Sequence, residues 1–254
     1  MRRIKITIAY DGTDYHGWQV QPGLPTIQGS LEEVVGELEG RPVHVAGSGR
    51  TDAGVHALAQ VAAFTLANPI PLENLRRALN RLLPPSIRVL AAGEVAAAFH
   101  PRHQAVSKLY EYRIVRSQVC SPFEWRYAHH HPYPLDLERM SALAPLFEGA
   151  QDFAAFASAD ERELETTVRR IFRSSLEVAA GRLTYRVRGS GFLKHMVRNM
   201  VGALLEAGKG NLNEAGLRAL LQPGCRQRAG PTAPAKGLFL VEVEYGSIES
   251  RFAR

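Results

Sequence analysis

The amino-acid sequence predicts an α+β protein with mostly antiparallel sheets. Short segments in which apolar and polar residues alternate recur along the chain, and this period of two is typical of strands with one buried face. Amphipathic helical segments, such as residues 27–39, separate them. The segments 166–180 and 182–189 are joined by a short turn at Ala180-Gly181, which favours antiparallel pairing.

The first half of the chain begins with a strand over residues 4–10, where isoleucines alternate with polar or small residues. Residues 27–39 carry an apolar stripe with glutamates outside it, which indicates a helix that ends at Gly40. The helix over residues 72–83 ends before Pro84 because a proline ring cannot continue a helix interior. The other strands expected in this half are 43–46, 58–66 and 87–91.

The second half has a similar order of elements but no convincing sequence identity to the first. A helix over residues 135–147 ends at Gly149, and another over 192–207 ends at Gly208. The other expected elements are strands 106–115, 166–180, 182–189 and 238–245 and a short helix over 213–221. The expected domains are 1–103 with the Asp52 loop and 104–248, followed by a frayed tail at 249–254.

The composition points to a soluble protein with an acidic partner. The formal net charge is +6 over 254 residues, which makes nucleic acid the leading candidate partner. The two cysteines, Cys120 and Cys225, lack the spacing of a disulfide framework or a thiol-rich metal site. We find no signal peptide and no apolar run long enough for a transmembrane helix, so the expected location is the cytoplasm.

The segment Gly47–Ala57 contains one carboxylate, Asp52, between glycine-containing turns and two residues after Arg50. An aspartate in such a loop is most simply a turn or helix-capping residue. In a loop that also binds a polyanion, the same aspartate becomes a candidate nucleophile.

Cationic residues concentrate between Arg182 and Arg198, where no acidic residue occurs. Arg186 and Arg188 share one strand face, whereas Lys194 and Arg198 are four residues apart on the expected helix. These residues form either a surface for phosphates or an ordinary solvated face.

A second basic segment mixes cations with aromatic residues. It begins near Arg102 and includes Lys108, Tyr110 and Tyr112. The two tyrosines share a strand face and are either core residues or platforms for base stacking.

Metal-dependent and nucleotide-dependent chemistries find little support. In His129-His130-His131, successive strand residues point to opposite faces, so these side chains do not converge on one ion. The glycine-rich loop lacks the Gly-Lys-Ser/Thr ending of a phosphate-binding loop, and no serine-nucleophile motif is present. We therefore expect no metal.

Several segments occur together in an order that resembles one known family. The longest and most specific are Gly49–Ala57 and Phe192–Gly202. The others are Tyr10–Thr13, Gly17–Gln21, Ile27–Gly29, Phe99–Arg102, Lys108–Arg113 and Ala233–Leu238. With these segments the chain resembles, over nearly its whole length, the tRNA pseudouridine synthase A family.

The resemblance implies an enzyme that converts uridine to pseudouridine at positions 38, 39 and 40 of the tRNA anticodon stem-loop. It implies that Asp52 is the nucleophile, that Arg198 pairs with it, and that Tyr110 packs on the target base and serves proton transfer. It also implies no cofactor, a homodimer, and two similar ferredoxin/RRM-like α+β halves that form a central cleft. A uridine inside a stem would have to be flipped out, at a cost of a few kcal/mol.

The residues that we expect to contact RNA share a positive charge or a flat ring: Tyr110, Arg50, Arg102, Lys108, Arg186, Arg188 and Lys194. Two other functions stay open. One is a non-catalytic tRNA-binding module, and the other is a metal-dependent nuclease that uses Asp52 and nearby histidines.

Overall fold

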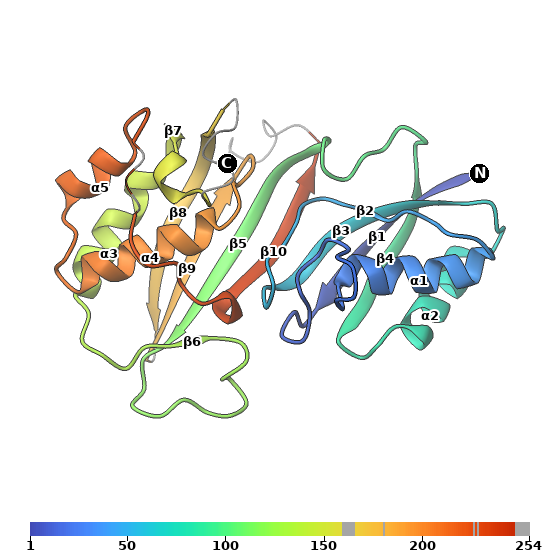
Figure 1. The fold of residues 1–254 in the computed structure, drawn as a ribbon, viewed down its shortest axis with the longest axis horizontal. Helices are drawn as coiled ribbons and strands as arrows, with labels where there is room; N and C mark the ends of the chain where they lie inside the picture. Colours follow the sequence, from blue (N-terminus) through green and yellow to red (C-terminus); the bar gives the residue numbers. More distant parts are fainter. Residues whose placement is uncertain (159–165, 180, 226, 228, 247–254) are drawn as a thin grey trace. The chain divides into compact units, whose positions relative to one another are not determined.

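The computed structural model describes residues 1–158, 166–179, 181–225, 227 and 229–246 (Figure 1). The chain divides into two compact units, one formed by Met1–Val106 with the residues from Phe239 onward, and the other by Ser107–Leu238. Both units combine helices with mostly antiparallel strands, which confirms the predicted α+β class. Ala180, at the predicted turn, and the predicted tail lie outside the described residues.

The first unit is built on four strands in the order β4-β1-β3-β10, with the short β2 paired to β3. Strand β1 pairs antiparallel with β3 and β4, whereas β10 runs parallel to β3. The unit contains β1 (Arg2–Tyr10), α1 (Ile27–Glu39), β2 (Ala46–Gly47), β3 (His56–Leu66), α2 (Leu72–Leu82), β4 (Ile87–Val95) and β10 (Leu238–Tyr245). Since β10 pairs with β3, this last strand belongs to the first unit, and the division differs there from the predicted domain 104–248.

The core of the first unit follows from the predicted periodicity. Ile4, Ile6 and Ile8 are completely buried on β1, and the residues between them are only half-buried. Helix α1 buries its apolar stripe and ends at Gly40, whose φ of 75° is left-handed. Glycine adopts this conformation without steric cost, so the predicted end of the helix is confirmed.

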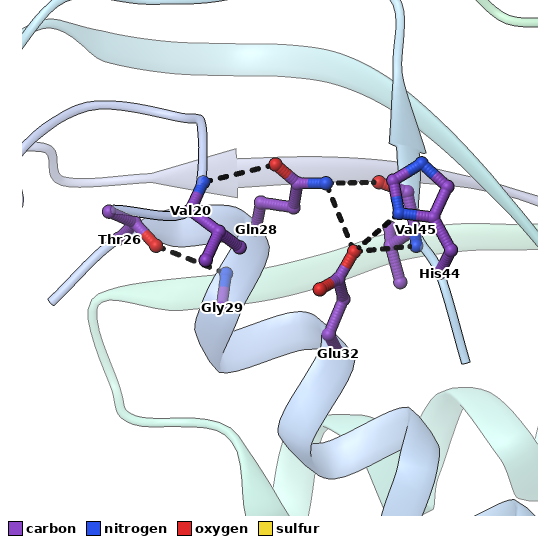
Figure 2. Close-up of polar contacts among 7 residues, drawn as sticks. All are labelled: Val20, Thr26, Gln28, Gly29, Glu32, His44 and Val45. Carbon is purple, nitrogen blue, oxygen red and sulfur yellow. Dashed lines mark hydrogen bonds and ion pairs between the residues drawn. The ribbon is translucent and has the colours of Figure 1, made fainter. Parts of the chain in front are cut away.

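The predicted strand 43–46 is wrong, because only its last residue belongs to a strand. Figure 2 shows the reason: the backbone of Val45 is bonded to side chains of α1 instead of to another strand. Its N–H donates to Glu32 Oε1 at 3.0 Å, and its carbonyl accepts from Gln28 Nε2 at 3.2 Å. Gln28 also donates to Glu32 at 3.0 Å, and Gln28 Oε1 accepts the Val20 N–H at 3.1 Å. The first turns of α1 therefore hold two loop segments, one at Val20 and the other at Val45.

Replacing Glu32 with alanine should destabilise the protein by about 1–2 kcal/mol, because the N–H of the buried Val45 loses its acceptor. Glu33 lies on the same helix but is exposed, so Glu33→Ala should change the free energy of unfolding by less than about 0.5 kcal/mol. Urea unfolding of both variants measures the difference. Equal stabilities of the two variants would show that the bond from the Val45 N–H to Glu32 does not stabilise the segment around Val45.

The second unit contains a sheet in the order β5-β9-β8-β7 with antiparallel neighbours, and the short β6 runs parallel to β5. Its strands are β5 (Ala105–Val115), β6 (His129–His130), β7 (Gly149–Asp152), β8 (Val168–Ala179) and β9 (Arg182–Gly189). Its helices are α3 (Leu137–Leu143), η1 (Ala144–Phe147), η2 (Ala154–Phe156), α4 (Met196–Gly208), α5 (Glu214–Leu220) and η4 (Ala235–Gly237). The predicted strands 106–115, 166–180 and 182–189 are confirmed within two residues.

Helix α4 begins later than predicted, at Met196 instead of Phe192. His195 before it has a φ of 64°, a left-handed conformation that breaks a right-handed helix. The predicted end of the helix is confirmed within one residue, since Gly208 is the last residue of α4. A Cβ atom on Gly208 would lie 2.6 Å from Met140 Sδ, so the glycine permits close packing against α3. The left-handed glycine after the helix is Gly210, with a φ of 86°.

The predicted helix over residues 135–147 is divided into α3 and the 3-10 turn η1. Asp136 caps α3, because its carboxylate accepts the Arg139 N–H at 2.9 Å. Pro145 lies in the first turn of η1, where its missing N–H does no harm. Among the described residues, no helix combines the length and the hydropathy that a membrane span requires.

Candidate active site

Asp52 lies in the loop Ser48–Val55 between β2 and β3, which we call the Asp52 loop. The loop turns back on itself, because the Val55 N–H donates to the Asp52 carbonyl at 3.1 Å and Gly54 has a φ of 76°. Asp52 is half-buried and Arg50 is exposed. Asp52 therefore lies in a turn that is partly accessible to solvent, with a cation on the same loop.

The segment after β1 presses directly against the backbone of the Asp52 loop. A Cβ atom on Gly12 would lie 2.0 Å from the Val55 carbonyl oxygen, and one on Gly17 would lie 2.5 Å from that of Thr51. The Trp18 N–H donates to the same Thr51 oxygen at 3.0 Å. Only glycine allows so close an approach, and at Gly17 the φ of 88° adds a second requirement. These contacts explain why a glycine-containing segment accompanies the Asp52 loop.

A buried polar network underlies the Asp52 loop. The Tyr10 hydroxyl and Thr51 Oγ1 are 2.9 Å apart. Gln60 Nε2 donates to the Gly49 carbonyl at 2.9 Å, and Ser48 Oγ donates to Gln60 Oε1. Tyr10, Ser48 and Gln60 are almost completely buried. Sequence reasoning did not assign Gln60 to the site, although a polar residue within the apolar run of β3 was a usable signal.

The exit of the Asp52 loop is anchored by His56, the first residue of β3. This side chain is 1% exposed and stacks on Phe239 of β10 with 4.7 Å between ring centroids. Its Nδ1 atom accepts the Gly12 N–H at 3.1 Å. Strand β10 thus supports the loop from the other side of β3.

In the second unit, Tyr110 lies on β5 and is 7% exposed. Its ring and that of Phe192 form an edge-to-face pair, with a centroid distance of 5.1 Å and an interplanar angle of 81°. This contact holds the orientation of the ring in the way that edge-to-face aromatic pairs do. Tyr110 is therefore a largely buried, oriented aromatic residue.

Arg198 lies on α4 and is bonded to the segment that precedes η4. Its Nε donates to the Ala233 carbonyl at 2.8 Å, and the Ala233 N–H donates to the Arg198 carbonyl at 3.2 Å. Burial raises the pKa of nearby Tyr112, and the positive charge of Arg198 partly opposes that shift. The Tyr112 hydroxyl donates to the Pro234 carbonyl at 2.8 Å. Arg198 thus lies near Tyr112. Tyr112 is two residues from Tyr110 on β5, so the two tyrosines share one face of the strand.

Arg186 and Arg188 lie on the opposite face of this sheet from Tyr110. In the β5–β9 register Arg186 pairs with Glu111 and Arg188 with Leu109, which point away from the tyrosines. Arg186 Nε is bonded to Glu111 at 2.9 Å and its Nη1 to Glu177 at 2.6 Å. The structure therefore does not bring these two arginines together with Tyr110.

The other predicted RNA-contacting cations are accessible to solvent. Arg50, Arg102 and Lys194 are exposed, and Lys108 is half-exposed on the strand that carries Tyr110. Asp52, Arg50 and Arg102 belong to the first unit, whereas the remaining members of the predicted set belong to the second. The set is thus divided between the two units.

In the histidine tract, His129 and His130 form β6 and are half-buried, and His131 after them is buried. The pKa of His129 is lowered to about 4, first by burial and then by the positive charge of His131 and Lys236. A histidine with this pKa is neutral at pH 7. Among the residues that the structure describes, no three histidine, cysteine or acidic side chains form a group able to hold a metal ion.

Comparison with known proteins gives consistent matches. The family model described as tRNA pseudouridine synthase matches residues 6–104 and 143–246, which include Asp52 and Arg198 but not Tyr110. The tRNA pseudouridine synthase A of Solibacter usitatus is 66% identical over 247 residues, covering 96% of this chain and 100% of the relative. That of Brevibacillus brevis is 44% identical over 245 residues, with the same coverage. That of Geotalea uraniireducens is 46% identical over 245 residues, again with the same coverage.

Proposed function

This chain belongs to the tRNA pseudouridine synthase family, and from this premise we propose that it converts uridine to pseudouridine at positions 38, 39 and 40 in the anticodon stem-loop of tRNA. The observation that carries the proposal is the Asp52 loop, which holds the half-buried Asp52 on a hydrogen-bonded backbone. The reaction breaks the N1–C1′ bond, rotates the base and forms a C5–C1′ bond. The C5 proton leaves and N1 gains a proton, so the product is an isomer of the substrate.

We assign Asp52 the role of nucleophile. A carboxylate acts in this way only when it is ionised, and a guanidinium beside it favours the ionised form. In our proposal Arg198 supplies that guanidinium when the enzyme is assembled on RNA. Its Nε bond to the Ala233 carbonyl fixes where the guanidinium lies on α4.

Tyr110 is proposed to pack on the flipped uracil and to serve proton transfer. Its contact with Phe192 supports this role, because a ring held in one orientation can offer a face to the base. Neither Asp52 nor Tyr110 needs a cofactor for these roles. The proposed reaction therefore uses side chains of the chain alone.

We propose that the exposed or half-exposed cations hold the RNA backbone: Arg50, Arg102, Lys108 and Lys194. The net charge of +6 favours association with the polyanion. Arg186 and Arg188 lie on the other sheet face, so in this proposal they contact phosphates away from the flipped base. Arg186 would then have to exchange a carboxylate partner for a phosphate.

The proposal extends to the assembly. We propose that the two ferredoxin/RRM-like units form the two sides of the RNA cleft and that the enzyme works in the cytoplasm as a homodimer. The resemblance of the motifs to the family is the support for these statements. Sedimentation equilibrium should give twice the mass of one chain, and the mass of a single chain would refute the dimer.

Chemical mapping of an unmodified tRNA transcript tests the proposed function. Pseudouridine should form at uridines 38, 39 and 40 only, and a transcript with cytidine at these positions should gain none. A non-catalytic binding module would retain the RNA but form no pseudouridine. A metal-dependent nuclease would shorten the RNA and stop in the presence of a chelator.

A further inference from the structure

The side chain of Thr51, the residue before Asp52, is hydrogen-bonded to the hydroxyl of Tyr10 in the core of the first unit. We propose that Tyr10 and Thr51 are positioning residues for the reaction, because their hydrogen bond fixes the backbone that presents the Asp52 carboxylate. The proposal rests on the proposed function, in which Asp52 is the reacting group. Neither residue is assigned contact with the substrate.

Thr51 is held at both its side chain and its carbonyl group. Its Oγ1 is 2.9 Å from the Tyr10 hydroxyl, and its carbonyl accepts the Trp18 N–H at 3.0 Å. On the other side of Asp52, the carbonyl of Asp52 itself accepts the Val55 N–H at 3.1 Å. The peptide groups on both sides of the Asp52 Cα atom are therefore fixed, although the residue itself is not fully buried.

Tyr10 provides a rigid end for this connection. It is the last residue of β1, where it pairs with Ala57 of β3 on one side and with Ile87 of β4 on the other. Its side chain is 4% exposed, and burial raises the pKa of the phenol, so the hydroxyl keeps its proton at pH 7. The hydroxyl joins the middle of the sheet to the residue that precedes Asp52.

Gln60 makes this connection part of a network. Its amide nitrogen donates to Gly49, its oxygen accepts the Val61 N–H at 3.2 Å, and it also interacts with the Tyr10 hydroxyl. Buried polar groups that satisfy one another restrict a segment to one conformation. Phenylalanine would fill the space of the Tyr10 ring equally well, so the hydroxyl is the atom whose role can be isolated.

The test measures the single-turnover rate of pseudouridine formation at saturating tRNA. Tyr10→Phe and Thr51→Val should each lower this rate roughly 10- to 100-fold, because small displacements of a reacting group have effects of this size. The affinity for tRNA should change less than about twofold, since neither residue is placed at the RNA. The double variant should be no slower than the slower single variant, because both changes remove the same bond.

Tyr185→Phe is the matched control. Tyr185 is 1% exposed, and its hydroxyl lies 2.7 Å from Ser174 Oγ in the second unit. This variant loses a comparable buried bond and should lose comparable thermal stability, yet it should turn over within about twofold of the parent. Thr51→Ser keeps the hydroxyl and should restore most of the rate that Thr51→Val loses.

Three results would overturn the proposal: a folded Tyr10→Phe variant with parental turnover, a multiplicative loss in the double variant, or an equal loss in Tyr185→Phe. If Tyr10→Phe does not fold, the comparison of Thr51→Val with Thr51→Ser decides. The Asp52→Asn variant separates the two proposals. Normal turnover in Asp52→Asn would refute the proposed function, whereas an inactive Asp52→Asn beside a fully active Tyr10→Phe would refute only the positioning role.

Discussion

Replacing Asp52 with asparagine should abolish pseudouridine formation in transcript tRNA while the protein stays folded and binds RNA. The carboxamide has nearly the shape of the carboxylate but cannot act as an anionic nucleophile, so the rate should fall by roughly 10⁴- to 10⁶-fold. The backbone bonds of the Asp52 loop to Trp18 and Tyr15 do not use this side chain and should survive. Chemical mapping of the transcript measures the product, and a filter-binding assay measures the RNA.

Asp14→Asn is the matched control for this experiment. Asp14 is exposed and lies in the segment that contacts the Asp52 loop. Asp14→Asn therefore removes one negative charge close to the loop and leaves the proposed nucleophile in place. It should keep turnover within about twofold of the parent. Full activity in Asp52→Asn would eliminate this residue as the nucleophile.

Replacing Gly12 with alanine should both destabilise the protein and slow the reaction. The new Cβ atom would lie 2.0 Å from the Val55 carbonyl oxygen, and neither atom can move away without a shift of the backbone. The Asp52 loop must therefore move. Overpacking of this kind costs about 1–3 kcal/mol or more, and a displaced Asp52 should lower turnover roughly 100-fold.

Gly93→Ala controls for the loss of a glycine in the same unit. A Cβ atom at Gly93, on β4, meets nothing within 4 Å, so this change should leave turnover unaltered and should not lower the unfolding temperature. Thermal unfolding and single-turnover assays of both variants supply the comparison. A Gly12→Ala variant as active and stable as Gly93→Ala would show that the close approach is not needed.

Most of the secondary structure could be predicted because its signal is local. The alternation along β1 and the apolar stripe of α1 depend only on neighbouring residues, and both elements are confirmed almost to the residue. The errors arise where distant contacts decide. Val45 lies in an apolar segment that is typical of a strand, but its backbone is hydrogen-bonded to side chains of α1.

The part of the candidate site that is local in the sequence could also be predicted. The Asp52 loop is one continuous segment, so its sequence identified it. The support beneath it was not predicted, because Tyr10 and Gln60 reach the loop only after β1 and β3 pair in one particular register. The position of Arg186 on the face away from Tyr110 likewise depends on the β5–β9 register, which alternation along one strand does not specify.

The release of tritium from C5 of uridine tests the central claim most directly, because C5 loses its hydrogen when it bonds to C1′. A tRNA transcript labelled at C5 is mixed with excess enzyme, and the tritium that appears in water is counted. We predict one tritium released per modified uridine by the parent, and none above background by Asp52→Asn with the same amount of RNA bound. Release by Asp52→Asn at the parental rate would contradict the account.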